Sequence, residues 1–131
     1  MKVLALDYGS ARTGVAVSDP TGTLARPLEV VENAAKPAGL RHLAEVARRE
    51  EVECIVVGLP VTLRGERGVQ AEETEAFVSA LKAVTDVPIE RFDERFTTKL
   101  AEAQPSEAPS DAVAAAHLLS TYLEWKSALP K

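Results

Sequence analysis

The order in which strand-like and helix-like segments follow one another constrains the fold of this chain more than any other feature. Short apolar or alternating segments near the N-terminus predict three closely connected strands, at Val3–Leu6, Thr13–Ser18 and Leu24–Val31. Helical spacing then alternates with strand-like runs, which predicts helix, strand, helix and strand at Pro37–Glu50, Glu53–Leu59, Val69–Val84 and Val87–Phe92. The order predicts an α/β fold with a mixed five-stranded sheet, in which three antiparallel strands precede parallel ones and helices cover both faces.

The pattern of residues at Val69–Val84 predicts a strong helix. Its predicted apolar stripe consists of Val69, Ala76, Phe77, Ala80, Leu81 and Val84. After the fifth strand, Thr97 could cap a short helix that runs to Ala103, and a last helix is predicted at Ser110–Ser127. Pro27 interrupts the third strand, which we therefore expect to be irregular or to lie at an edge of the sheet.

Length and composition indicate one domain that spans residues 1–131. Apolar runs such as CIVVGL are too short to cross a membrane, and the N-terminus does not resemble a signal peptide. The single cysteine, Cys54, cannot form an intramolecular disulfide, and its apolar strand predicts a buried, inert thiol. These features favour a cytoplasmic protein without a membrane partner.

The net charge of the chain limits how it can bind nucleic acid. A formal charge of −5 and a pI near 5.1 argue against a protein that coats nucleic acid non-specifically, because such binding requires many phosphate contacts. A nuclease that binds through a local basic patch is still compatible with this charge. Acidic residues that hold metal ions also add to the negative total.

Carboxylates stand at the ends of predicted elements. Asp7 ends the first strand, Asp93 and Glu94 follow the fifth, and Asp111 begins the last helix. If strands one and five run parallel, their ends meet at one edge of the sheet, where ligands gather in α/β proteins. Carboxylates drawn together repel each other unless they bind protons or cations. Mg²⁺ and Mn²⁺ prefer oxygen ligands, and two such ions about 4 Å apart can activate water for phosphodiester cleavage.

Each acid also has a purely structural interpretation. Asp7 could simply form a turn before Gly9. Asp93 and Glu94 could form surface ion pairs with the neighbouring arginines, which contribute little to stability. Asp111 could serve only to stabilise the helix dipole. Each acid taken alone is therefore weak evidence, and it is their joint placement that favours a metal site.

Glycines and basic residues near these acids are candidates for binding phosphate. Gly9 and Gly14 bracket the turn after Asp7, where glycine allows a ligand to approach the backbone closely. A Gly- and Arg-containing loop, PVTLRGERG, lies between a strand and a helix but lacks the Walker A ending. The basic candidates are Arg12, Arg64, Arg67, Arg95 and Lys99.

Four stretches taken together resemble the YqgF family, also called RuvX. In chain order they are LALDYGSARTGVAVSD, VVGLPVTLRGERGVQAEETEAFVSAL, FDERFTTKLAEA and SDAVAAAHLLSTYL, and they span nearly the whole chain. This family is a bacterial branch of the RNase H-like nucleases and is related to the RuvC Holliday-junction resolvases. The resemblance implies an RNase H-like fold, which agrees with the order of elements inferred above.

The resemblance also implies a hydrolase: a nuclease that depends on one or two Mg²⁺ or Mn²⁺ ions. Asp7, Glu94 and Asp111 match the acids of the family, and Asp93 lies beside them as a further contributor. Arg95 and the loop with Arg64 and Arg67 resemble phosphate contacts. The family is usually described as maturing the 5′ end of the 16S ribosomal RNA precursor, a step of ribosome biogenesis. One departure is the segment QPSEAPS before Asp111, which is shorter than usual in the family.

Three alternative functions remain open at this point. A RuvC-like resolvase would cut branched DNA as a two-fold homodimer, whereas a nuclease of single-stranded RNA can act as a monomer. A non-catalytic nucleic-acid-binding module is disfavoured because all three acidic positions are filled. An ATP-binding protein of the actin and sugar-kinase superfamily also has an aspartate and glycine after its first strand. That superfamily needs two such domains, and this chain has room for one.

Overall fold

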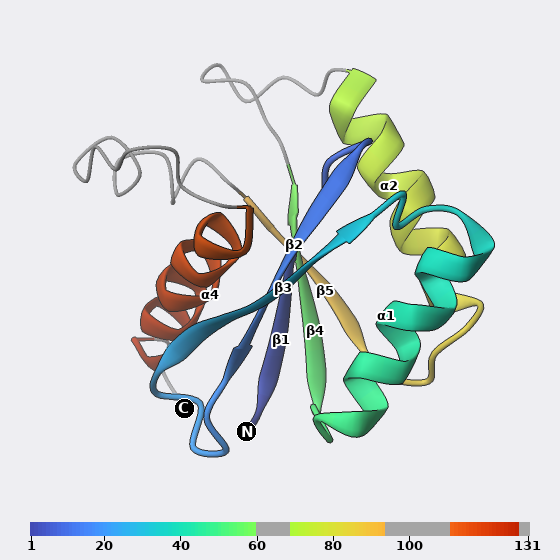
Figure 1. Cartoon of the computed structure of the whole chain (residues 1–131). Helices are drawn as coiled ribbons and strands as arrows, with labels where there is room; N and C mark the ends of the chain where they lie inside the picture. Colours follow the sequence, from blue (N-terminus) through green and yellow to red (C-terminus); the bar gives the residue numbers. More distant parts are fainter. Residues whose placement is uncertain (60–68, 94–110, 129–131) are drawn as a thin grey trace.

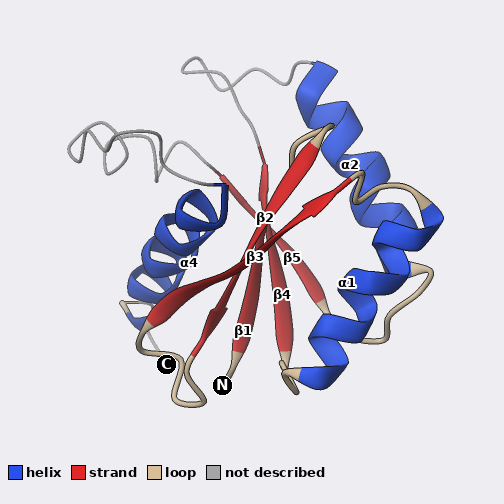
Figure 2. Ribbon diagram, in the orientation of Figure 1, coloured by secondary structure: helices blue, strands red, loops and turns tan. Residues whose placement is uncertain are grey.

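The computed structural model describes residues 1–59, 69–93 and 111–128, and these form one sheet with helices on both faces (Figures 1 and 2). The strands are β1 (Val3–Asp7), β2 (Arg12–Ser18), β3 (Ala25–Glu32), β4 (Cys54–Leu59) and β5 (Ile89–Asp93). The helices are α1 (Pro37–Arg49), α2 (Val69–Lys82) and α4 (Asp111–Ser127). The predicted helix at Thr97–Ala103 lies outside the described residues.

The sheet has the predicted mixed topology. Its strand order is β3-β2-β1-β4-β5, with β1–β2 and β2–β3 antiparallel and β1–β4 and β4–β5 parallel. The three parallel strands therefore end at one edge of the sheet. The edge strand β3 shows a register shift where Ala16 faces Pro27, as expected from a residue that lacks a backbone donor. The predicted strand arrangement is confirmed.

Side chains alternate across the sheet and form two separate cores. Leu4 and Leu6 of β1 pack on the face covered by α1 and α2, whereas Val3 and Ala5 pack on the face covered by α4. Figure 1 shows α4 on one side of the sheet and the other two helices on the opposite side. Because successive strand residues point to opposite faces, Asp7 follows Val3 and Ala5 onto the α4 side.

The buried face of α2 differs from the predicted stripe. The buried residues among those described are Ala71, Thr74, Phe77, Val78 and Leu81. Ala76 and Val84 are exposed, the latter at 41%, so their assignment to the stripe is wrong. The buried Thr74 explains the error, because a polar residue on the inner face of the helix is missed by a search for apolar residues.

The structure also bears on two predictions that were made from composition. Cys54 is 5% exposed, and burial together with the nearby Glu90 carboxylate raises the pKa of its thiol to about 11, which confirms the inert thiol. Across the described ranges, no helix is both long and apolar enough to cross a membrane.

Candidate active site

Asp7 is the last residue of β1 and stands at the edge where the parallel strands end. It pairs directly with Gly14 of β2 in the antiparallel ladder. Its side chain is half-buried, because it follows a strand whose preceding residues are all buried. The buried strand β1 therefore ends in a carboxylate at the edge of the sheet, on the side covered by α4.

Gly14 allows α4 to approach the end of β1 closely. A Cβ atom on Gly14 would lie 1.8 Å from the Asp111 carbonyl oxygen and 3.0 Å from the Ala112 nitrogen. No side chain fits in that space, so the first turn of α4 packs against the bare backbone of β2. Because Gly14 is also the ladder partner of Asp7, it is adjacent to both acidic residues. Gly14 is buried, so its absent side chain makes room for α4 rather than for a ligand.

Asp111 is the first residue of α4, where a carboxylate interacts favourably with the helix dipole. Its Oδ2 atom lies 3.4 Å from Nε of Arg12, and the two side chains are 40% and 66% exposed. Arg12 is the first residue of β2 and shares the α4 side of that strand with Gly14 and Ala16. The structure therefore gathers three of the predicted residues, Asp7, Arg12 and Asp111, around Gly14.

Gly9 and Tyr8 shape the turn between β1 and β2. A Cβ atom on Gly9 would lie 2.5 Å from the Arg12 carbonyl oxygen, so this turn is too tight for a side chain. The Tyr8 ring stacks on Phe77 of α2 with centroids 4.4 Å apart. Burial, with a smaller effect of Glu73, raises the pKa of Tyr8. Sequence reasoning missed Tyr8 as the residue that ties the turn to α2, although an aromatic residue directly after the acid was a usable signal.

For the remaining predicted site residues, the structure describes at most the backbone. Asp93 ends β5 and pairs with Leu59 of β4, so its backbone lies at the same edge of the sheet as Asp7. Nothing further is described for its side chain. The other residues lie outside the described ranges and are Arg64, Arg67, Glu94, Arg95 and Lys99.

The described part of the site suits a hard divalent cation. Asp7 and Asp111 offer carboxylate oxygens, the ligands that Mg²⁺ and Mn²⁺ prefer. Asp111 already has a cationic partner in Arg12, which shows that this position accommodates positive charge. Within residues 1–59, 69–93 and 111–128, no group of three or more potential metal ligands is assembled.

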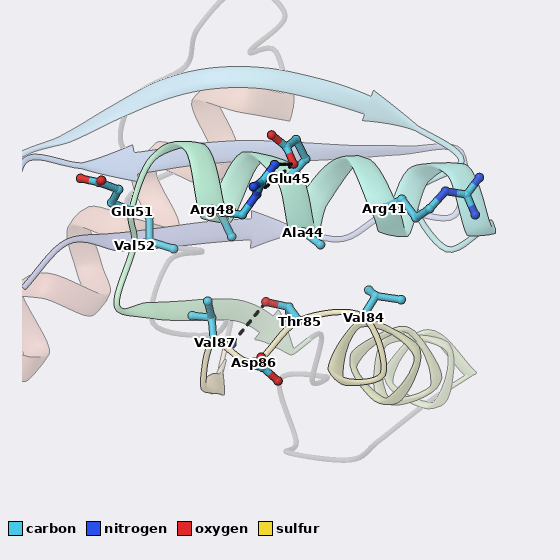
Figure 3. Close-up of a pocket in the computed structure, with 11 residues that line it drawn as sticks. Arg41, Ala44, Glu45, Arg48, Glu51, Val52, Val84, Thr85, Asp86 and Val87 are labelled. Carbon is cyan, nitrogen blue, oxygen red and sulfur yellow. Dashed lines mark hydrogen bonds and ion pairs between the residues drawn. The ribbon is translucent and has the colours of Figure 1, made fainter.

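A separate groove lies at the opposite end of the sheet (Figure 3). Its volume is about 580 Å³, and it runs between α1 and the connection from α2 to β5. Its apolar lining includes Ala44, Val52, Val84 and Val87. Val52 and Val87 precede β4 and β5, so the groove lies where these parallel strands begin. The acids lie at the other edge of the sheet, where the parallel strands end. The groove is therefore not part of the candidate active site.

The fold is that of the RuvC-like resolvases within the RNase H-like class. A structure described as "T. thermophilus RuvC in complex with Holliday junction substrate" matches with a TM-score of 0.68 at 18% identity, over 98% of this chain and 96% of that one. A second, "Thermus thermophilus RuvC structure", matches with a TM-score of 0.61 at 15% identity, over 97% and 96%. At such identities these similarities establish the fold alone.

The family follows from closer sequence matches. A family model described as "RuvX: Holliday junction resolvase" matches residues 1–125, and the chain belongs to this RuvX family. A relative from Rubrobacter xylanophilus is 47% identical over 131 aligned positions, covering 94% of this chain and 92% of its own. One from Chloroflexus aurantiacus is 36% identical over 137 positions, covering 98% and 90%. Both are named "Putative pre-16S rRNA nuclease". The resemblance noted from the motifs is confirmed.

Proposed function

We propose that this chain is a metal-dependent nuclease that hydrolyses phosphodiester bonds during 5′-end maturation of the 16S ribosomal RNA precursor. The observation that carries the proposal is that Asp7 and Asp111 are both adjacent to Gly14, at the edge of the sheet where β5 ends one residue before Glu94 in the sequence. The family and the names of the relatives support a nuclease and this substrate. Such a role would place the protein in the cytoplasm, acting as a single domain of residues 1–131.

In the proposed mechanism, Asp7, Glu94 and Asp111 hold one or two Mg²⁺ or Mn²⁺ ions, and Asp93 is a further candidate ligand. When bound, the ions supply an activated water and stabilise the charge on the leaving 3′ oxygen. Close packing of α4 on Gly14 fixes the separation of Asp7 and Asp111, so the two carboxylates are preorganised for this work. Because Gly9 has no side chain, the tight turn beside the two carboxylates projects little from the edge of the sheet.

Basic residues around the acids are proposed to hold the substrate. Guanidinium groups bind phosphate oxygens through paired donors, which orients the scissile group. Arg12 lies beside Asp111 and is well exposed, so it can reach a phosphate at the rim of the site. The other proposed phosphate contacts, assigned from sequence, are Arg64, Arg67, Arg95 and Lys99.

A RuvC-like resolvase is the second candidate function. It is favoured by the description of the matching family model and by the RuvC-like fold. A resolvase must cut two strands symmetrically, which requires a two-fold homodimer with paired sites. Cleavage of single-stranded RNA has no such requirement. The oligomeric state during cleavage therefore separates the two functions.

The decisive experiment is a side-by-side cleavage assay on precursor 16S RNA and a four-way DNA junction, with Mg²⁺ and Mn²⁺ tested separately. We expect cleavage of the RNA, and we expect Asp7→Asn to abolish it because the substitution removes a ligand's charge while keeping its shape. Asp86→Asn, an exposed acid in the groove at the far end of the sheet, is the matched control. Cleavage of the junction alone would replace the proposed function with the second candidate. Wild-type cleavage by Asp7→Asn would refute the assigned site.

A further inference from the structure

We propose that Arg12 is an internal counter-ion for Asp111, which a divalent cation displaces and which then contacts a substrate phosphate. The proposal rests on the proposed nuclease function and adds a regulatory step to it. Arg12 would thereby make nucleic-acid binding dependent on metal loading. It is a positioning residue for Asp111 in the metal-free protein and a substrate contact in the loaded one.

The placement of Arg12 supports the first half of this proposal. Arg12 stands two residues before Gly14 on β2, so its side chain lies on the same side of the sheet as Asp7 and α4. Its Nε atom lies 3.4 Å from Oδ2 of Asp111. Gly14 fixes the backbone of Asp111 against the same strand. The guanidinium therefore occupies space next to the carboxylate that a metal ion would need to approach.

The exposure of the pair explains why it can be broken. The Arg12 side chain is 66% exposed and that of Asp111 is 40% exposed, so water screens their attraction. Exposed ion pairs of this kind contribute little to stability. A divalent cation that is also held by Asp7 has twice the charge and more than one ligand, and it can replace the guanidinium. In the metal-free protein, the same ion pair reduces repulsion between the acids.

The freed guanidinium has an obvious partner in the proposed reaction. Arg12 is the first residue of β2, so its backbone is held in the sheet and its guanidinium moves only within the reach of one side chain. A phosphate bound at the metal would place anionic oxygens within this reach, and the planar guanidinium favours paired contacts with them. Metal and nucleic acid would then increase each other's affinity, as thermodynamic linkage requires.

The first test measures Mn²⁺ affinity by titration calorimetry in the absence of nucleic acid. We expect Arg12→Ala to bind Mn²⁺ about three- to fivefold more tightly than wild type, the range expected when an exposed ion pair stops competing. Arg12→Lys keeps the charge and should stay close to wild type. The matched control is Arg26→Ala on β3, because Arg26 is 61% exposed and pairs with Glu50 at a distance of 3.8 Å, away from the acids. This control should leave Mn²⁺ affinity unchanged.

The second test measures binding of a single-stranded RNA oligonucleotide in EDTA and in Ca²⁺. In EDTA, Arg12→Ala and wild type should bind equally, because Arg12 is engaged with Asp111. In Ca²⁺, wild type should bind about three- to fivefold more tightly than Arg12→Ala. Equal losses in both conditions would overturn the coupling, since Arg12 would then be an ordinary phosphate contact.

Failure of the inference and failure of the proposed function give different results. If Asp111→Asn weakens Mn²⁺ binding but Arg12→Ala leaves it unchanged, the counter-ion role is overturned and the nuclease site survives. If neither Asp7→Asn nor Asp111→Asn changes Mn²⁺ affinity, the metal site itself is refuted. Circular dichroism of each variant confirms folding, and Arg12→Gln provides a second neutral variant for the comparison.

Discussion

At the scale of single residues, Gly14 shows how the lack of a side chain can set the position of an acidic residue, Asp111. The backbone of Asp111 fills the space that a Cβ atom would need, and Asp7 lies directly opposite in the ladder. The separation of the two acids therefore depends on direct packing of a helix terminus on a strand. An intervening side chain would push the helix outward and the carboxylates apart.

Gly14→Ala should impair both stability and cleavage. Replacing glycine by alanine at a compatible position stabilises a protein by about 0.4–1 kcal/mol, but overpacking of a tight contact costs about 1–3 kcal/mol. Overpacking should prevail here, because a contact of 1.8 Å with a carbonyl oxygen cannot be relieved by rotating a side chain. Displacing a ligand by about 1 Å can cost about 100-fold in rate. Chemical denaturation and single-turnover cleavage measure the two effects.

Gly39→Ala is the matched control for Gly14→Ala. A Cβ atom on Gly39 would lie 2.5 Å from the Asn33 carbonyl oxygen, so a similar backbone clash arises in α1, on the opposite face of the sheet from α4. This variant should lose stability but cleave at close to the wild-type rate below its unfolding temperature. If both variants lost the same fraction of activity, Gly14 would have no particular role in positioning Asp111.

At the scale of elements, α4 links the second core to the candidate site. Its inner face buries Leu118, Leu119 and Tyr122 against the sheet, and its first residue is Asp111. The rings of Tyr122 and Phe92 meet edge to face with centroids 5.5 Å apart, which ties the helix to β5. Packing along the helix therefore holds its acidic end in place.

Leu119→Ala should reduce metal affinity as well as stability. Leu119 is fully buried on α4, and truncating a buried leucine to alanine costs about 2–5 kcal/mol of unfolding free energy. Leu81→Ala on α2 removes an equally buried leucine from the other core and should cost a similar amount. Only the α4 variant should also weaken Mn²⁺ binding, measured by calorimetry on folded protein. Equal effects of the two variants on Mn²⁺ would contradict a role of α4 packing in the site.

The order of elements was predictable from sequence because short apolar runs, helical spacing and turn residues act locally. The first strand and the last helix were assigned within a residue or two, which correctly placed Asp7 at a strand end and Asp111 at a helix start. The stripe of α2 was misassigned because Thr74 is polar yet buried. The contacts of Arg12 and Gly14 with Asp111 could not be predicted. They depend on where α4 crosses β2, which tertiary packing decides.

At the scale of the whole molecule, the two ends of the parallel strands have different chemistry. The acids and Arg12 stand where the strands end, whereas the groove between α1 and the α2–β5 connection stands where they begin. The whole chain carries a formal charge of −5, so nucleic acid is not attracted to its surface in general. We therefore expect nucleic-acid binding to depend on a small number of basic residues close to the acids.

The salt dependence of RNA binding tests this view of the molecule. Each phosphate contact on a single strand contributes about −0.7 to the slope of log affinity against log salt concentration. If the contacts are Arg12, Arg64, Arg67, Arg95 and Lys99, the slope in Ca²⁺ should be about −3.5. Arg12→Ala should reduce its magnitude by about 0.7, because one contact is lost, whereas Arg26→Ala should not change it. A slope twice as steep, or an equal effect of Arg26→Ala, would show that the nucleic acid spreads over a much larger surface than the rim around Asp7 and Asp111.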